Sequence, residues 1–237
     1  MKNLVLIGDV HSQYSKFSRA VKWIENNVED YHIIQGGDLF DSRTTESDSA
    51  SVYELMKSLG NKITVLHSNH LWKLFRVIQN PEIETNDCMK RTITDLTEAG
   101  ISFDEIYSWL KTLPYGIVFR DANNQEYRAC HAFWNRKIYV PQSYNGFYKI
   151  QDVTRKSRDY MLYGLKRKVG DDSRESVRWW KEKADHEYIR VSFHYHTISV
   201  DPTGKTGNRH IILDGSCGSD NGELPVYIVN NNHLILF

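Results

Sequence analysis

Side chains of the kinds that bind metal ions recur in this sequence directly after short apolar runs. The aspartate, asparagine and histidine residues at these five places are Asp9 and His11, Asp38 and Asp41, Asn69 and His70, His131, and His194 and His196. One such residue alone would have a plain structural explanation, because Asp and Asn cap helices and form turns. Five apolar runs that all end in this way favour a shared site.

The mixture of side chains indicates which metals such a site would take. Carboxylate and amide oxygens combined with imidazole nitrogens suit Mn, Fe or Zn. The three cysteines are widely spaced and form no CxxC pair, so a thiolate zinc site is excluded. Two divalent ions about 3.5–4 Å apart clamp a phosphate and lower the pKa of a bridging water, which gives a hydroxide nucleophile near neutral pH. An aspartate shared between the ions offsets their mutual repulsion. The residues therefore indicate metal-assisted hydrolysis of a phosphate ester.

The elements that must position these residues alternate between short strands and amphipathic helices in the first third of the chain. We expect strands at residues 4–8, 32–35 and 63–67, and helices around residues 17–24 and 52–59. Strands that alternate with helices of this length predict an α/β fold with parallel pairing in this part. In such a sheet, ligands bind beyond the carboxyl ends of the strands, where Asp9, Asp38 and Asn69 all fall.

The later part of the chain has a different pattern. We expect helices over residues 87–111 with a break at Gly100, a hairpin at residues 117–120 and 127–131, helical structure over the charged residues 152–186, and strands near residues 189–193, 210–213 and 226–229. Residues 155–190 hold eleven Lys and Arg against seven Asp and Glu, which indicates mainly a solvated helical face. No repeat or linker interrupts the sequence, so we expect one continuous domain over residues 1–237.

The composition limits the classes of protein to which the chain can belong. It has 237 residues, with thirty Lys and Arg against thirty Asp and Glu, so its formal net charge is zero. Proteins that bind duplex DNA stably are usually strongly basic, and we do not expect such binding here. No stretch approaches the ~20 apolar residues of a membrane span. We expect a cytoplasmic protein with no membrane partner, and its oligomeric state is left open.

Five motifs resemble, in order and spacing, those of the calcineurin-like metallophosphoesterases. Gly8-Asp9-Val10-His11 is similar to GDxHG, the stretch from Gly37 to Arg43 to GDxxDRG, Ser68-Asn69-His70 to GNHE/D, His131-Ala132 to HAG or HGG, and Tyr195-His196-Thr197 to GHT. The stretches at residues 69–76, 113–115 and 212–218 resemble the serine/threonine protein-phosphatase branch, which includes the lambda phage phosphatase and the phosphatase domain of bacterial polynucleotide kinase-phosphatase. The resemblance implies a four-layer α/β fold of the α+β type, with mixed sheets flanked by helices.

The resemblance also implies a role for each matching residue. Asp9 and His11 would bind the first metal ion, Asp38 would bridge both ions, and Asn69, His131 and His196 would complete the second site. His70 would be the general acid that protonates the leaving oxygen, oriented by Asp41. The cofactor implied is a pair of divalent ions, with Mn²⁺ expected first and Fe or Zn as alternatives.

The sequence departs from the family motifs at positions that bear on the site. Ser42 stands where GDxxDRG has arginine, and Arg43 follows one place later as the expected phosphate-binding residue. Arg178 is a second candidate for binding the phosphate. His194 lies two residues before His196, and two interpretations stay open for it. It is either a neighbour of the site, which we prefer, or a further metal ligand, as in family members that end in GHxH.

Three functions remain open from the sequence. The first is a serine/threonine protein-phosphatase-like enzyme that hydrolyses phosphomonoesters with two metal ions. The second is the same chemistry on nucleotides or RNA ends, as in an RNA-end phosphatase, a 2′,3′-cyclic phosphodiesterase or a dinucleoside tetraphosphate hydrolase. The third is a binding module that has lost activity, which would fit the departures at Ser12, Ser42, Ser68 and Leu71. Because every implied metal ligand is present, we prefer the enzyme, with a phosphorylated protein, a nucleotide or an RNA end as its partner.

Overall fold

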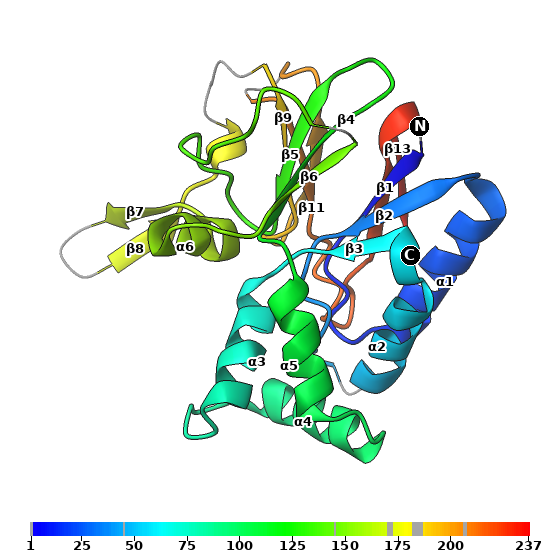
Figure 1. Cartoon of the computed structure of the whole chain (residues 1–237), viewed down its shortest axis with the longest axis vertical. Coiled ribbons are helices and arrows are strands. Elements are labelled where there is room, and N and C mark those ends of the chain that lie inside the picture. Colours follow the sequence, from blue (N-terminus) through cyan, green and yellow to red (C-terminus); the bar gives the residue numbers. More distant parts are fainter. Residues whose placement is uncertain (1, 45, 145, 170–172, 182–186, 206–207) are drawn as a thin grey trace.

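Two mixed β-sheets form the centre of the protein (Figure 1). The structure, a computed structural model, describes residues 2–44, 46–144, 146–169, 173–181, 187–205 and 208–237. The first sheet has the order β13-β12-β1-β2-β3, and its strands are β1 (Asn3–Ile7), β2 (Tyr31–Gln35), β3 (Ile63–Val65), β12 (Pro225–Ile228) and β13 (His233–Leu236). Within it, β1, β2 and β3 pair in parallel, as the sequence predicts, while β12 and β13 are antiparallel additions at one edge.

The second sheet has the order β10-β11-β9-β5-β4-β6. Its strands are β4 (Gly116–Arg120), β5 (Glu126–Cys130), β6 (Phe147–Ile150), β9 (Ile189–Ser192), β10 (Ile198–Asp201) and β11 (His210–Leu213). The predicted hairpin is β4 and β5, and the three predicted late strands are β9, β11 and β12. The sequence pattern did not predict β6, β10 and β13, which are short edge or near-edge strands with few fully buried positions.

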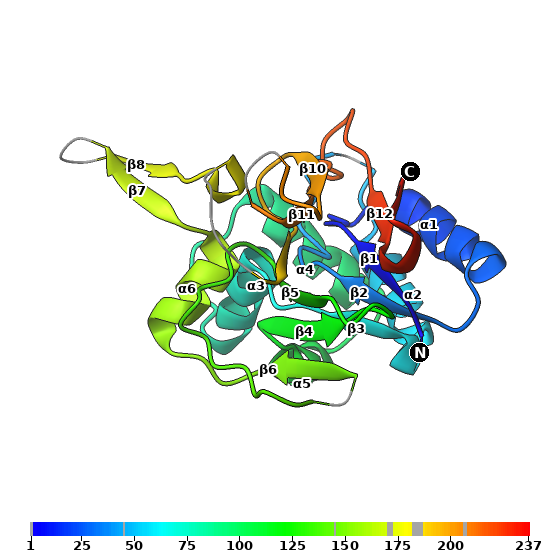
Figure 2. The ribbon, with the colours of Figure 1, turned by 90° about the horizontal axis from the view of Figure 1, so that it is seen from above.

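Helices cover the outer faces of both sheets (Figures 1 and 2). They are α1 (Tyr14–Asn27), α2 (Ser49–Ser58), α3 (Asn69–Gln79), α4 (Asp87–Glu98), α5 (Phe103–Thr112) and α6 (Arg155–Tyr163). The predicted break in residues 87–111 is confirmed, because Gly100 lies between α4 and α5 with φ +75°. In the described part of the chain, no helix combines the length and apolar character needed to cross a bilayer.

Side chains that alternate along the strands divide the core into layers. Val5 and Ile7 of β1 pack into a cluster with the helices of the first layer, whereas Leu4 and Leu6 face the second sheet. Val118 of β4 points to the opposite face of that second sheet, where it shares a cluster with Met161 of α6. The order is therefore helices, sheet, sheet and helix, which confirms the predicted α/β arrangement of mixed sheets flanked by helices.

The prediction of helical structure over residues 152–186 is wrong for most of that segment. Helix α6 ends at Tyr163, and β7 (Lys166–Val169) and β8 (Ser173–Ser176) follow as an antiparallel hairpin that extends away from the two sheets (Figure 2). Gly164 has φ +78°, and a Cβ there would lie 2.6 Å from Tyr195 Oη, so the chain leaves the helix where only glycine fits. Residues 170–172 and 182–186 lie outside the described residues.

We expect His32 on β2 to make the folded protein less stable in acid. Its Nε2 is 3.0 Å from Thr64 Oγ1, and its ring centroid is 4.8 Å from that of Phe147. Burial, together with the charges of Lys2 and Lys149, lowers the pKa of His32 from 6.5 to about 4. Between these pH values the unfolded chain binds a proton that the folded chain does not. Stability is therefore retained above pH 6.5 and lost as the pH falls toward 4.

Urea unfolding at pH 7.5 and pH 4.5 measures this contribution. Because solvent screens part of the effect, we expect His32 to account for about 1–2 kcal/mol of the lost stability. His32→Gln can still form a hydrogen bond with Thr64 but does not titrate, so the difference between the two pH values should shrink by that amount. An undiminished difference in this variant would show that other groups cause the acid sensitivity.

Candidate metal centre

A cavity of about 460 Å³ lies beyond the carboxyl ends of β1 and β2, and we call it the metal cavity. The residues with charged, amide or imidazole side chains that line it are Asp9, His11, Asp38, Asp41, Arg43, Asn69, His70, His194, His196 and Asp214. His131 is completely buried next to it, with its Nε2 atom 2.7 Å from Asn69 Oδ1. Strand ends that are far apart in the sequence thus meet at one place.

The backbone that carries the first ligands is held in an uncommon conformation. The amide N–H groups of Val10 and His11 both donate to the carbonyl oxygen of Asp38, at 3.1 and 2.8 Å, and so tie the two loops together. His11, Asp38 and Asp41 have φ values of +49°, +32° and +75°, in the left-handed region that residues with a Cβ rarely adopt. Such residues concentrate at functional sites, where the surrounding structure maintains them.

Serine replaces two motif glycines without disturbing this geometry. Ser68 accepts hydrogen bonds from the backbone N–H groups of Leu71 (3.2 Å) and Asp38 (2.9 Å), so it caps α3 and also fixes the loop of the predicted bridging ligand. Ser12 adopts φ +59°, and its hydroxyl lies 2.9 Å from that of Ser49. These departures therefore leave the ligand geometry intact and do not favour a degenerate site.

Two histidines present the same ring nitrogen to the cavity. The Nδ1–H of His11 lies 3.1 Å from the carbonyl oxygen of Asp41, and the Nδ1–H of His131 donates to the carbonyl oxygen of Gly36 at 3.0 Å. With Nδ1 turned to a carbonyl oxygen in each ring, the Nε2 atoms are the ones that can face a cation. They lie 3.9 Å and 3.5 Å, respectively, from Oδ2 of Asp38.

The potential ligand atoms form two groups that share one residue. Asp9, His11 and Asp38 make one group, and Asp38, His131 and His194 make the other, with the atoms of each group within 4.8 Å of one another. Asp38 therefore belongs to both groups, and its role as a bridging carboxylate stays a prediction. His194 lies in the second group, whereas His196 is in neither.

His196 lies at the rim of the cavity. Its side chain is 66% exposed, and Nδ1 is 3.7 Å from Oδ2 of Asp214. The role that the motif resemblance implies for His196 at the second metal site stays a prediction, and the distances favour its neighbour His194 for that role.

The electrostatics of the cavity fit bound cations. Oδ1 of Asp9 is buried and has no hydrogen-bond partner among the described residues. Burial raises the pKa of Asp9, and the nearby carboxylates of Asp38 and Asp214 raise it further, because both effects disfavour the charged form. Burial lowers the pKa of His131, and lowers that of His194 to about 3, so both rings are in the neutral form that binds metal.

His70 and Asp41 form a pair beside these ligands. Nδ1 of His70 is hydrogen-bonded to Oδ2 of Asp41, and its Nε2 is 3.8 Å from Oδ2 of Asp38. Burial lowers the pKa of His70, but the two carboxylates outweigh burial and raise it to about 9. The ring therefore carries a proton near neutral pH, as a general acid requires.

The two candidates for binding the phosphate differ in position. Arg43 lines the metal cavity, whereas Ser42 is buried beneath it and accepts a hydrogen bond from Nε2 of Gln13 at 3.0 Å. Arg178 is exposed, between β8 and a 3-10 turn at Trp179–Lys181, and does not line the cavity. Both roles stay predictions, and the positions favour Arg43.

Asp214 was not predicted as a site residue, although it follows β11 just as Asp9 follows β1. It is buried, and its Oδ2 accepts hydrogen bonds from the backbone N–H groups of Tyr195 (2.7 Å) and His196 (2.6 Å). It therefore fixes the segment that carries His194 and His196. The signal that would have found it is the polar residue after an apolar run, the same signal that found the others.

Comparison with known families agrees with this geometry. The model of the calcineurin-like phosphoesterase family matches residues 2–223. The chain belongs to this family. Enzymes of the family use a binuclear metal centre, and this calcineurin-like phosphoesterase is a metal-dependent phosphatase.

Solved structures show the same fold at low sequence identity. A protein assigned as a diadenosine tetraphosphatase is 15% identical with a TM-score of 0.57, and the match covers 100% of this chain and 93% of that one. A serine/threonine phosphatase from Saccharomyces cerevisiae, with similarity to human phosphatase PP5, is 12% identical with a TM-score of 0.50, over 100% of this chain and 79% of that one. No curated protein matches the sequence significantly.

Proposed function

We propose that this calcineurin-like phosphoesterase hydrolyses phosphomonoesters at a two-metal centre in the metal cavity, with phosphoserine and phosphothreonine residues of proteins as substrates. The observation that carries the proposal is the pair of ligand groups that share Asp38, directly beside the protonated pair of His70 and Asp41. The mixed oxygen and nitrogen donors favour Mn²⁺, with Fe and Zn as alternatives.

The ligand assignment follows the two groups of atoms. Asp9 and His11 would hold the first ion, Asp38 would bridge, and Asn69, His131 and His194 would hold the second. When bound, the ions supply positive charge that binds the phosphoryl oxygens and activates water for attack on phosphorus. Their charge also offsets the repulsion among the buried carboxylates.

The chain's own side chains orient the ester and move one proton. Arg43 and the amide of Asn69 line the cavity and are placed to hydrogen-bond phosphoryl oxygens, where a guanidinium can bind in bidentate fashion. His70 gives its Nε2 proton to the oxygen of the leaving alcohol as the P–O bond breaks. Asp41 holds the ring in place and stabilises its positive charge before the transfer.

The lining of the metal cavity supports a phosphorylated side chain over a nucleotide. Among the described residues that line it, none is Phe, Tyr or Trp, so it has no ring on which a base could stack. The exposed ring of His196 shows that the rim is open to solvent, which suits a phosphate presented on a protein surface.

A substrate panel with metal titration tests the proposal. With Mn²⁺, an aryl phosphate should be hydrolysed well above an Asp38→Ala control, because Asp38 belongs to both ligand groups. At equal concentrations, we expect a phosphoserine peptide to have a higher kcat/KM than an RNA 3′-phosphate, a 2′,3′-cyclic phosphate or diadenosine tetraphosphate. Preference for one of these nucleotides would overturn the substrate class, and no hydrolysis above the control would overturn the enzyme.

A further inference from the structure

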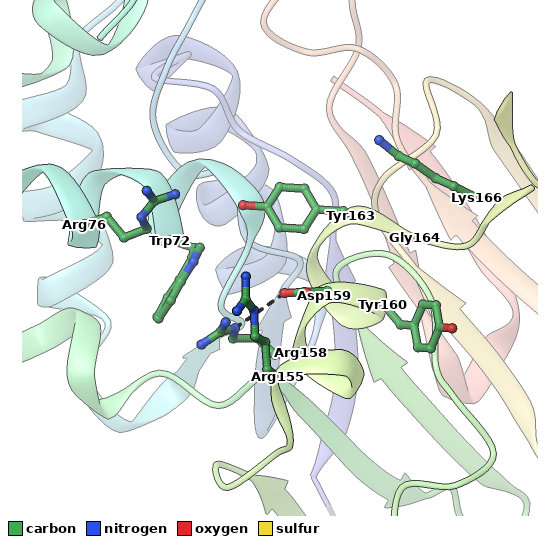
Figure 3. Close-up of a pocket in the computed structure, with 9 residues that line it drawn as sticks. All are labelled: Trp72, Arg76, Arg155, Arg158, Asp159, Tyr160, Tyr163, Gly164 and Lys166. Carbon is green, nitrogen blue, oxygen red and sulfur yellow. Dashed lines mark ion pairs between the residues drawn. The ribbon is translucent and has the colours of Figure 1, made fainter. Parts of the chain in front are cut away.

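A second cavity, larger than the first, is lined by residues of α3, α6 and the start of β7, and we call it the basic pocket. Its volume is about 780 Å³. The charged residues that line it are Arg76 of α3, Arg155, Arg158 and Asp159 of α6, and Lys166 of β7 (Figure 3). Four cations against one acid make this a concentrated positive site in a chain whose formal net charge is zero.

The basic pocket shares no lining residue with the metal cavity, but two features indicate that the two cavities are close to each other. Helix α3 begins at Asn69 in the metal cavity, and Arg76 lies seven residues later on the same face. At 1.5 Å per residue, this separation is about 10 Å along the helix. Gly164 also lines the pocket and lies against Tyr195, the residue between His194 and His196. The two cavities are therefore neighbours.

The pocket offers several positive charges, and its tryptophan ring is already engaged. The Trp72 ring is already engaged by the Arg158 guanidinium, 4.4 Å from its centroid, and by the stacked Phe75 ring at 5.2 Å. Arg158 is held further by Asp159, 3.7 Å from its Nε atom. Tyr163 extends its hydroxyl across the pocket toward α3 (Figure 3). Trp72 is therefore already in contact with other side chains, whereas an anion would meet the four cationic side chains of the lining.

Three of the cations are available to a ligand. Among the side chains that the structure describes, Arg76, Arg155 and Lys166 have no ion-pair partner, and Asp159 engages only Arg158. Arg76 reaches the pocket from α3, and Arg155 and Lys166 reach it from α6 and β7 (Figure 3). Guanidinium groups that line one pocket from separate elements are suited to carboxylate or phosphate oxygens.

We propose that the basic pocket binds a second anionic side chain of a phosphoprotein substrate, about three residues from the phosphoserine or phosphothreonine that is hydrolysed. The distance sets the register, because an extended peptide covers about 10 Å in three residues. A glutamate and a second phosphorylated residue present the same chemistry to these cations. The proposal rests on the proposed phosphoprotein phosphatase function and adds a sequence preference to it.

Matched phosphopeptides test this preference. Each would carry one phosphoserine and, three residues before or after it, alanine, glutamate or a phosphonate analogue of phosphoserine that cannot be hydrolysed. We expect glutamate or the phosphonate at one of these positions to raise kcat/KM over alanine by roughly 5- to 30-fold, mainly through KM. The advantage should fall in 0.5 M salt, which screens exposed charges. Comparing the glutamate and phosphonate arms shows which anion the pocket prefers.

Two double variants test whether the basic pocket causes the preference for acidic peptides. In Arg76→Gln/Arg155→Gln, the ratio of kcat/KM between acidic and alanine peptides should fall to about one. Arg19→Gln/Lys22→Gln removes the same charge from α1, at the far side of the molecule from α6 (Figure 2), and should keep the wild-type ratio. An equal fall in both double variants would mean that overall charge, not the pocket, sets the preference, and would overturn the proposal.

Three further outcomes separate the two proposals. Equal rates on all phosphopeptides would overturn the basic pocket as a substrate site and leave the proposed function standing. Hydrolysis of an aryl phosphate but of no phosphopeptide would overturn the phosphoprotein function and, with it, this use of the pocket. If diadenosine tetraphosphate hydrolysis alone loses kcat/KM in Arg76→Gln/Arg155→Gln, the pocket serves a nucleotide, and our assignment of its ligand is wrong.

Discussion

Replacing His70 by asparagine should slow hydrolysis of alkyl phosphates about 10²- to 10⁴-fold, the range that a positioned general acid contributes. The reason is the pair that His70 forms with Asp41, which keeps a proton on the ring beside the position of the leaving oxygen. An alkoxide needs that proton in order to leave, whereas p-nitrophenolate leaves without it. Measured with both esters, the variant should lose far more turnover on the alkyl phosphate.

The pH dependence gives the same role a second test. The pKa of His70 is raised to about 9, so the acid is present below that pH and is lost as the pH rises through it. Part of this rise comes from Asp38, whose charge bound cations would share, so the alkaline fall in rate should lie at or below pH 9. His70→Asn should lack this fall. Equal losses on the two esters, or an unchanged alkaline limb, would remove His70 from proton transfer.

Metal analysis tests whether His70→Asn is slow only because it has lost a metal ion. His70 belongs to neither ligand group, so His70→Asn should bind the same number of ions as the wild type. Loss of an ion in this variant would mean that the lower rate reports a damaged centre instead of a missing acid.

Most residues of the metal cavity could be predicted because their polar side chains follow directly after strands. An apolar run followed by Asp, Asn or His fixes a place in an α/β sheet, and the parallel pairing of β1, β2 and β3 then brings Asp9, Asp38 and Asn69 together. The same reasoning should have included Asp214. Its contacts with the backbone of Tyr195 and His196 join segments that the sequence pattern does not connect.

The parts that could not be predicted depend on contacts between distant segments. Tyr195 occupies the space that a side chain at Gly164 would need, and no periodicity in residues 152–186 contains that contact. The basic pocket could not be predicted from the sequence for a similar reason. Arg76 and Arg155 come from two helices, and a chain with zero net charge gives no sign that they line the same pocket. The spacing of His194 and His196 likewise allows either residue to point inward.

The assignment of His194 to the second metal site predicts a large effect. His194→Ala should bind one ion fewer per chain than the wild type and lose roughly 10³-fold in kcat, because a lost ion removes several kcal/mol of transition-state stabilisation. The reason is geometric: His194 presents a ring nitrogen within 4.8 Å of ligand atoms of Asp38 and His131, and its buried ring is neutral. Elemental analysis after dialysis against Mn²⁺, together with turnover of an aryl phosphate, measures both quantities.

His196→Ala is the matched control, because it removes the same side chain two residues away. The His196 ring is at the rim and outside both ligand groups, so this variant should keep the second ion and most of the activity. Measuring Tm with and without metal separates folding from binding. The wild type and His196→Ala should gain the full rise in Tm from two bound ions, and His194→Ala should gain less. If His196→Ala loses an ion while His194→Ala binds two, the motif-based assignment is correct and the one drawn from the distances is wrong. Loss of one ion in each variant would mean that both histidines are ligands, as in GHxH, because His196 would then complete the site of Asp9 and His11.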